Sequence, residues 1–365
     1  MSPQTAIRCS VIRGGTSKGL YFHATDLPRD TATRDAVLLA AMGSPDVREI
    51  DGMGGAHPLT SKVAIINPSA RENVDVDYLF LQVWPDRAEV SDNQNCGNLL
   101  AGVGPFALEE GLVSATGPVT EVRIWMENTQ SLAVERVQTP GGSVRYDGDT
   151  HIDGVPGSSA PVPIEFLDIA GSSCGSLLPT SNAVDVIDGV RVTCIDNGMP
   201  VVCLHASDVG LTGSESPSEI EANLEVCARV EHIRLQAGKL MNLGDVSTAT
   251  VPKMSLLAPA LHGGTIATRT FIPKRVHEAI GVFGAVSVAT ACLVPGSVAH
   301  DIALLHSDEG ATTIDVEHPT GYFSVSMDVS LEEGDVQVRS SALLRTARLL
   351  MRGDVFIPGS IWSGS

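Results

Sequence analysis

Asn95-Cys96-Gly97-Asn98 stands directly before an apolar run with the sequence LLAGVGPFAL at 99–108. The run predicts a helix that is apolar on every side and therefore buried. A thiol at the start of such a helix faces unpaired backbone N–H groups and the positive end of the helix dipole, a setting that favours the thiolate. The same N–H groups can bind a carboxylate. This stretch therefore predicts a central helix whose first turn contributes to a site for a small anion.

Lys62 interrupts a second apolar run, LTSKVAII at 59–66, which is typical of a β-strand. A surface lysine on a strand edge is the simpler interpretation. The apolar neighbours on both sides argue against it, because burial lowers the pKa of a lysine and lets it act as a base near neutral pH. Lys62 and Cys96 together suggest proton-transfer chemistry on a small anion.

The composition narrows the class of partner. The 365 residues include 43 acidic and 24 basic side chains, so the formal net charge is −19. This charge disfavours nucleic acid and anionic membranes as partners, and an anionic ligand would need a local cluster of cations. No apolar run approaches the roughly 20 residues that a membrane-spanning helix needs. The first residues, MSPQT, lack the features of a signal peptide, so we expect a cytoplasmic protein.

The seven cysteines are widely spaced and include no CxxC pair. Disulfides and a zinc site are therefore not expected, and a reducing cytoplasm fits best. Neither a GxGxxG nor a Walker pattern is present, which argues against a nucleotide. We predict no metal and no cofactor.

The two halves of the chain resemble each other. Ile12-Arg13-Gly14-Gly15 precedes FHATDL at 22–27, and Ile195-Asp196-Asn197-Gly198 precedes LHASDV at 204–209. The start of the first apolar helix, at Cys96, matches a second one near His277, and the matches share an offset of 181 to 183 residues. Lys253 matches Lys62 more loosely, at 191. An ordered set of matches indicates a duplication.

Capping and turn signals place several elements. We expect helices at 30–42 and 217–238, with Ser216 as the cap of the second, and strands at 190–206 and 264–273. The tail at 336–356 is expected to hold a strand and a helix, and the join between the halves is expected at 179–188.

Four motifs together carry a family resemblance: RGGTSKG at 13–19, DGMGG at 51–55, TSKV at 60–63 and NCGN at 95–98. The set resembles the PrpF family of cofactor-independent isomerases, which has the diaminopimelate-epimerase fold. Within the family, the chain is most similar to the 4-oxalomesaconate tautomerases and isomerases. The resemblance implies an α+β fold of two similar domains, each a β-barrel-like sheet around a central helix, with the active site in the interdomain cleft. We expect the domains at 1–183 and 184–365, with the tail packing back on the first.

The resemblance also implies site residues. Lys62 and Cys96 fall on the catalytic positions of the family, with Lys62 as the main base. At the expected start of the second helix, the chain has His277 and Glu278 and no second cysteine. This difference favours a proton shuttle that acts on one face of the substrate only. The residues expected to bind substrate are Arg13, Ser17, Lys18, Asn95, Gly97, Asn98, Arg275 and His277.

The implied reaction moves a proton and a double bond in an unsaturated tricarboxylic keto acid. The expected substrate is 4-oxalomesaconate from gallate, protocatechuate or lignin-derived aromatic catabolism, and the step is either a keto–enol tautomerisation or an allylic isomerisation. One alternative keeps the fold and takes 2-methylaconitate, methylitaconate or aconitate. A second alternative is a non-catalytic protein that binds small acids. The expected partners are a small di- or tricarboxylate and, as an assembly, a homo-oligomer.

Overall fold

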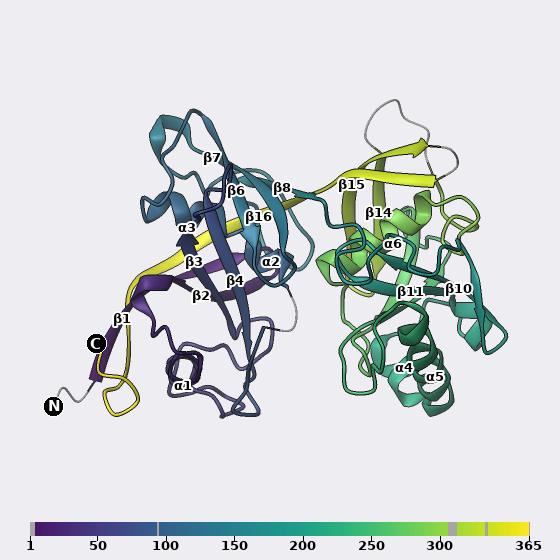
Figure 1. Ribbon diagram of the computed structural model, residues 1–365, viewed down its shortest axis with the longest axis horizontal. Coiled ribbons are helices and arrows are strands. Elements are labelled where there is room, and N and C mark those ends of the chain that lie inside the picture. Colours follow the sequence, from purple (N-terminus) through teal and green to yellow (C-terminus); the bar gives the residue numbers. More distant parts are fainter. Residues whose placement is uncertain (1–3, 93–94, 306–311, 333–334, 365) are drawn as a thin grey trace. The chain divides into compact units, whose positions relative to one another are not determined.

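The computed structural model describes residues 4–92, 95–305, 312–332 and 335–364. The described chain has mixed α+β content and is mostly sheet, as expected. It divides into two compact units, which are described separately: unit 1 holds residues 1–164 and 344–365, and unit 2 holds residues 165–343 (Figure 1).

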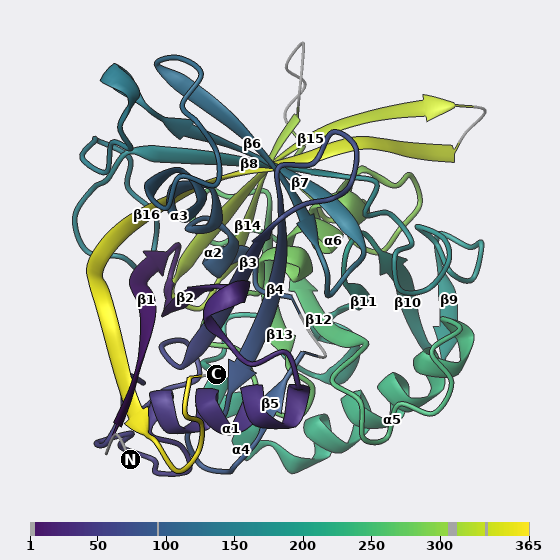
Figure 2. The same cartoon turned by 60° about the vertical axis from the view of Figure 1, so that its left-hand side comes forward.

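Unit 1 is a ring of strands. Its elements are β1 (Gln4–Gly14), β2 (Ser17–His23), η1 (Ala24–Asp26), α1 (Thr31–Met42), β3 (Lys62–Pro68), β4 (Val76–Val83), β5 (Val90–Ser91), α2 (Gly97–Leu100), α3 (Val103–Glu109), β6 (Val119–Met126), β7 (Ser131–Gln138), η2 (Pro140–Gly142) and β8 (Pro161–Leu167), with the second half of β16 (Asp335–Pro358). The strand order is β1-β2-β3-β4-β6-β7-β8-β16, and β16 pairs with β1 again. This return pairing closes the ring, and β1 and β16 run side by side in Figure 2.

The helix predicted at 30–42 is confirmed as α1. The Asp30 side chain accepts a hydrogen bond from the Thr33 N–H (2.9 Å), and Gly43 ends the helix in the left-handed region at φ 81°. These are the two standard capping devices of a helix. The buried face of α1, which includes Leu38 and Met42, packs on one side of the strands around Leu20 and Phe22.

The apolar run at 99–108 forms two short helices, α2 and α3, and not the single helix we predicted. Pro105 explains the break, because a proline has no N–H to donate to the carbonyl four residues earlier and is tolerated only in the first turn of a helix. The expected burial is confirmed: Leu99, Leu100, Val103 and Phe106 are buried. The pair contacts β1, β2, β3, β6 and β7 and so lies within the ring.

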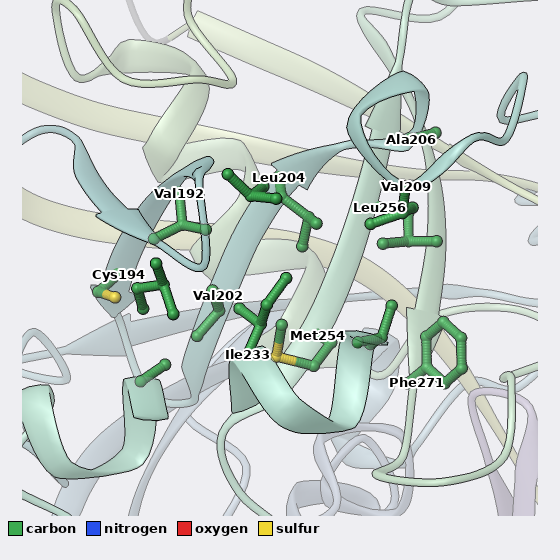
Figure 3. Close-up of a cluster of buried hydrophobic side chains, with 14 of the residues drawn as sticks. Val192, Cys194, Val202, Leu204, Ala206, Val209, Ile233, Met254, Leu256 and Phe271 are labelled. Carbon is green, nitrogen blue, oxygen red and sulfur yellow. The ribbon is translucent and has the colours of Figure 1, made fainter. Parts of the chain in front are cut away.

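Unit 2 repeats part of this plan. Its elements are β9 (Asp185–Ile187), β10 (Val190–Asp196), β11 (Pro200–His205), η3 (Ala206–Val209), α4 (Pro217–Ala222), α5 (Leu224–Leu240), β12 (Lys253–Ala258), β13 (Ile266–Phe271), α6 (Val282–Leu293), β14 (Thr312–His318) and β15 (Gly321–Glu332), with the first half of β16. The strand order is β16-β15-β14-β13-β12-β11-β10-β9. Figure 3 shows part of the core of unit 2, in which Val202 and Met254 lie beside Ile233, and Leu204 and Leu256 belong to the same cluster.

Three predicted elements need correction. The helix expected at 217–238 is interrupted at Asn223, whose side chain caps α5 by accepting from the Val226 N–H (3.2 Å). Its predicted cap Ser216 is confirmed, in a capping box with Glu219. The second apolar helix begins at Val282 and not near His277. The tail forms the single strand β16, because its backbone pairs with β15 over 335–343 and with β1 over 347–358, which leaves no segment for a helix.

The unit boundaries also differ from the expected 183/184. They fall at 164/165, within β8, and at 343/344, within β16, so residues 344–365 belong to unit 1. The expected join at 179–188 lies within unit 2, and the segment before it bonds to β10. The Asp196 N–H donates to the Leu177 carbonyl, and the Gly171 N–H donates to the Asp196 carbonyl.

Candidate active site

Cys96 is the N-cap residue of α2, which agrees with its predicted place at a helix start. Its backbone is extended (φ −132°, ψ 94°), and its Sγ accepts a hydrogen bond from the Leu99 N–H (3.4 Å). The Asn95 side chain accepts from the Cys96 N–H (2.7 Å), and the Ser17 Oγ lies 3.9 Å from the sulfur. The thiol is half-buried and has polar neighbours, so it lies outside the apolar core.

The glycine turn between β1 and β2 lies against α2. Gly15 has φ 51°, and a Cβ on it would come within 2.2 Å of the Asn98 Oδ1. Only glycine fits there, since the conformation is strained for other residues and the space is filled. The Thr16 N–H donates to the Asn98 side chain (3.4 Å). Of the predicted binding residues, Ser17, Asn95, Gly97 and Asn98 therefore gather around Cys96.

Lys62 is the first residue of β3 and is only 6% exposed. Its Nζ donates to the Gln82 Oε1 (2.7 Å) and lies 4.9 Å from the centre of the Phe80 ring. Burial lowers the pKa of Lys62 from its ordinary value, and the nearby Cys96 opposes this shift in part. Lys62 and Cys96 are therefore close enough to influence each other electrostatically.

Gln82 is a residue that our sequence analysis missed. Its amide nitrogen donates to the carbonyls of Ser61 (3.0 Å), Val83 (3.0 Å) and Pro58 (3.1 Å). These bonds fix the amide so that its oxygen faces Lys62. A polar residue in the apolar strand 76–83 was the available signal, but its partner follows only from the pairing of Lys62 with Gln82 across β3 and β4.

Glu49 organises the loop that carries the DGMGG motif. Its carboxylate is buried and accepts from the Ala56 N–H (2.7 Å) and from the Ser61 hydroxyl. A Cβ on Gly54 would lie 2.2 Å from the same carboxylate, so the glycine is required for this close approach. The loop is thereby fixed to the residue directly before Lys62.

Arg13 and Lys18, two further predicted binding residues, flank the glycine turn. They pair across β1 and β2, but alternation along β2 turns Ser17 and Gly19 toward α2 and Lys18 toward the opposite face. The Lys18 Nζ lies 3.5 Å from the position of a Cβ on Gly55. The Arg13 guanidinium donates to the Thr346 carbonyl (2.9 Å) and to the Gly15 carbonyl (3.1 Å). Among the described residues, the Cys96 side chain has its hydrogen-bond contacts with Ser17 and Leu99, and not with Arg13 or Lys18.

Arg275 and His277 belong to unit 2 and precede α6 by several residues. Arg275 is largely exposed and ion-paired with Glu221 (2.9 Å), and this pairing raises its pKa. The His277 Nδ1 accepts from the Ala279 N–H (2.8 Å). The N-cap of α6 is Gly281, so our placement of His277 at the helix start was wrong. A glycine has no side chain to cap or react, and the position that corresponds to Cys96 thus lacks a thiol, as expected.

The remaining cysteines differ from Cys96 in their surroundings. Cys203 and Cys292 are fully buried, and burial raises the pKa of the Cys292 thiol to about 12. We predict that iodoacetamide alkylates Cys96 faster than either, because the thiolate is the reactive species and access is required. Peptide mapping after brief labelling measures this, with Cys96→Ser as the control for the assignment. Preferred labelling of Cys203 or Cys292 would contradict it.

No group of three or more His, Cys, Asp or Glu side chains in the described residues is arranged to hold a metal ion. No helix among them is long and apolar enough to cross a membrane.

The profile of the PrpF protein family matches residues 4–358. This chain belongs to the PrpF family. Two similar PrpF-family relatives are the (4E)-oxalomesaconate Delta-isomerase of Novosphingobium sp. (strain KA1) and the 4-oxalomesaconate tautomerase of Pseudomonas putida (strain KT2440). The first is 61% identical over 96% of this chain and 97% of that protein. The second is 57% identical over 99% of both chains.

A solved structure extends the comparison. The crystal structure of a methylitaconate-delta-isomerase superposes on this chain with a TM-score of 0.85 at 35% sequence identity. The match covers 99% of this chain and 97% of the isomerase chain. The PrpF-family architecture of this chain is therefore that of an isomerase of known structure.

Proposed function

We propose that this chain is a cofactor-independent isomerase that moves a proton and a double bond in 4-oxalomesaconate. The observation that carries the proposal is the buried Lys62 amine, fixed by Gln82 and coupled to the Cys96 thiol. Relatives at 57–61% identity that bear the names of 4-oxalomesaconate isomerase and tautomerase support the substrate.

In the proposed reaction, the neutral Lys62 amine removes a proton from the carbon next to the conjugated system. The amine donates one hydrogen to the Gln82 oxygen, so its lone pair is free to accept the substrate proton. The negative charge spreads into a dienolate, which the N–H groups at the start of α2 stabilise. A proton then returns to another carbon, and Cys96 donates, relays or orients it.

The gathered polar groups support a site for carboxylates. Ser17, Asn95, Gly97 and Asn98 surround the thiol, and we assign them to substrate binding. Arg13 orders the glycine turn through its bonds to Gly15 and Thr346, so we assign it a positioning role. Lys18, Arg275 and His277 stay as predictions, as do the interdomain location of the site and the cytoplasmic location of the protein.

A second candidate substrate keeps the same chemistry. The structural similarity to a methylitaconate-delta-isomerase favours methylitaconate as the alternative, and a 34% identical 2-methyl-aconitate isomerase supports 2-methylaconitate. All these acids share an unsaturated carbon skeleton with carboxylates, so one lysine–thiol pair can serve each of them.

The test is a direct assay. Purified protein is mixed separately with 4-oxalomesaconate, 2-methylaconitate and methylitaconate in deuterated buffer, and ultraviolet absorbance and proton NMR are followed. We expect turnover of 4-oxalomesaconate to exceed that of the other acids, with deuterium incorporated at carbon. Faster turnover of 2-methylaconitate or methylitaconate would mean that this acid, and not 4-oxalomesaconate, is the substrate. Binding without exchange or isomerisation of any of the acids would refute an isomerase.

A further inference from the structure

Two tyrosines inside the ring of unit 1 contact the main chain of α2. Tyr21 of β2 and Tyr78 of β4 are both fully buried. The Tyr21 hydroxyl donates to the Leu99 carbonyl, and the Tyr78 hydroxyl donates to the Cys96 carbonyl (3.4 Å). One contact therefore lies at the N-cap residue of α2 and the other within the helix, and both come from the surrounding strands.

α2 is too short to hold its position by itself. It spans only Gly97–Leu100, and isolated helices shorter than about 12–15 residues are marginal in water. The Leu100 N–H donates to the Cys96 carbonyl (3.0 Å), and the Gly102 N–H donates to the Leu99 carbonyl (3.1 Å). These bonds shape the turn but do not attach it to the sheet. The two tyrosine hydroxyls attach the same two carbonyls to β2 and β4.

Two glycines leave space for the Tyr21 hydroxyl. A Cβ on Gly102 would come within 2.4 Å of the hydroxyl oxygen, and a Cβ on Gly14 would come within 3.1 Å. The Tyr21 ring also packs against Phe106 of α3, with 5.9 Å between the ring centres. Because close packing leaves the side chain little freedom, its bond to Leu99 fixes the place of α2 relative to β2.

β4 connects the contact at Cys96 to Lys62. Side chains two residues apart on a strand point to the same face, so Tyr78, Phe80 and Gln82 form one row. Gln82 accepts from the Lys62 amine (2.7 Å), and the Phe80 ring centre lies 4.9 Å from the same nitrogen. At the other end of the row, Tyr78 bonds to Cys96. One strand thus holds both of the predicted catalytic residues.

β2 carries a similar row on the other side of β3. Ser17, Gly19 and Tyr21 are alternate residues of this strand and face α2. The Ser17 Oγ lies 3.9 Å from the Cys96 sulfur, and a Cβ on Gly19 would lie 3.1 Å from the Leu99 side chain. α2 therefore packs on rows from the two strands that flank the strand of the predicted base.

The two tyrosine hydroxyls keep their protons. Burial raises the pKa of Tyr21 and of Tyr78 well above the usual range, and the nearby Cys96 and Glu135 add to the rise. A protonated hydroxyl that is bonded to a main-chain carbonyl acts as a hydrogen-bond donor. The tyrosines therefore hold the main chain and transfer no proton to a ligand.

We propose that Tyr21 and Tyr78 are positioning residues, whose hydroxyl groups hold α2 so that the Cys96 thiol keeps a fixed place relative to Lys62. The proposal rests on the function proposed above, because it concerns the same lysine–thiol pair. Proton transfer is sensitive to the separation of the groups involved, and a misplacement of about 1 Å can lower a rate about 100-fold. The tyrosines act on the reaction through the main chain of α2.

The test removes one hydroxyl at a time, in Tyr21→Phe and Tyr78→Phe. Phenylalanine keeps the ring, and the two carbonyls keep their bonds from Gly102 and Leu100, so both variants should fold. A neutral hydrogen bond shifts an equilibrium about 2–10-fold, and we expect kcat to fall by about this factor. KM should change less, because proton transfer depends more steeply on distance than binding does. Tyr322→Phe, at an exposed position of β15, should leave both constants unchanged.

Amide hydrogen exchange measures the order of α2 without the reaction. The Leu99 N–H donates to the Cys96 sulfur, so its exchange reports on the place of the thiol. We expect peptides that contain residues 97–101 to exchange about 2–10-fold faster in both variants than in the wild type. Peptides from α1 serve as the control, because α1 packs on the opposite face of β2, against Leu20 and Phe22.

The two measurements together separate positioning from stability. Faster exchange with an unchanged kcat would overturn the proposal, and so would a lower kcat with unchanged exchange. A fall in Tm alone would make the tyrosines structural only. If the wild type fails to isomerise 4-oxalomesaconate, the proposed function fails, while the exchange at residues 97–101 still decides whether the tyrosines hold α2.

Discussion

Lys62→Met is expected to lower kcat by about 10²–10⁴-fold and to leave the fold intact. Removal of a positioned general base has costs of this size. Methionine matches the length and apolar stem of lysine, and it removes a buried amine whose charged form burial disfavours. Steady-state kinetics with 4-oxalomesaconate measure the loss, and circular dichroism and Tm report on folding.

The pH dependence gives a second check on Lys62. Only the neutral amine can accept a proton, so kcat/KM of the wild type should rise with pH through the lowered pKa of Lys62. Gln82→Leu should shift this rise, because it removes the acceptor of the amine. Lys239→Met, at an exposed site, serves as the control for general charge loss. A folded Lys62→Met enzyme with near-normal kcat would exclude Lys62 as the base.

Arg234→Met is expected to lower the free energy of unfolding by about 3–5 kcal/mol. The Arg234 side chain is fully buried in α5 and makes a two-fold ion pair with Glu231 (2.6 and 2.9 Å). It also donates to the carbonyls of Val246 (2.9 Å) and Val251 (3.1 Å). Methionine would leave these acceptors without donors at the segment that leads into Lys253.

Urea unfolding measures the change. The matched control is Arg229→Met in the same helix, where the arginine is exposed and donates to the Asp208 carbonyl (2.8 Å). Exposed positions of this kind change stability by about 0.5 kcal/mol or less. A loss below about 1 kcal/mol for Arg234→Met would mean that water replaces the buried bonds.

Local signals predicted parts of the fold well. Asp30 and Gly43 mark the ends of α1, and the burial of the central helices follows from their composition. The prediction of one helix at 99–108 was wrong because it did not take into account the helix break that Pro105 causes. The start of α6 was misplaced because Gly281 gives no capping signal in the sequence. The path of β16 depends on pairing with β1, more than 300 residues away, which no local pattern reveals.

In the candidate site, too, the features that depend on local sequence were predicted, and those that depend on strand pairing were not. Cys96 and its neighbours are consecutive in the sequence, so the motif predicted their grouping. Gln82 was missed because its role depends on strand register. Arg13 and Lys18 flank the glycine turn, but the alternation of side chains along β2 sends Lys18 to the other face from Ser17. The bond of Arg13 to the Thr346 carbonyl likewise depends on a part of β16 that is remote in sequence.

The pairing of β1 with β16 has a consequence for synthesis of the protein. Residues 165–343 form one continuous stretch, so unit 2 has all its residues before the second half of β16 leaves the ribosome. The ring of unit 1 closes only when residues 347–358 reach β1. Until then, β1 presents an unpaired edge, which can add a strand from another chain. We therefore expect chains truncated before residue 344 to aggregate through β1.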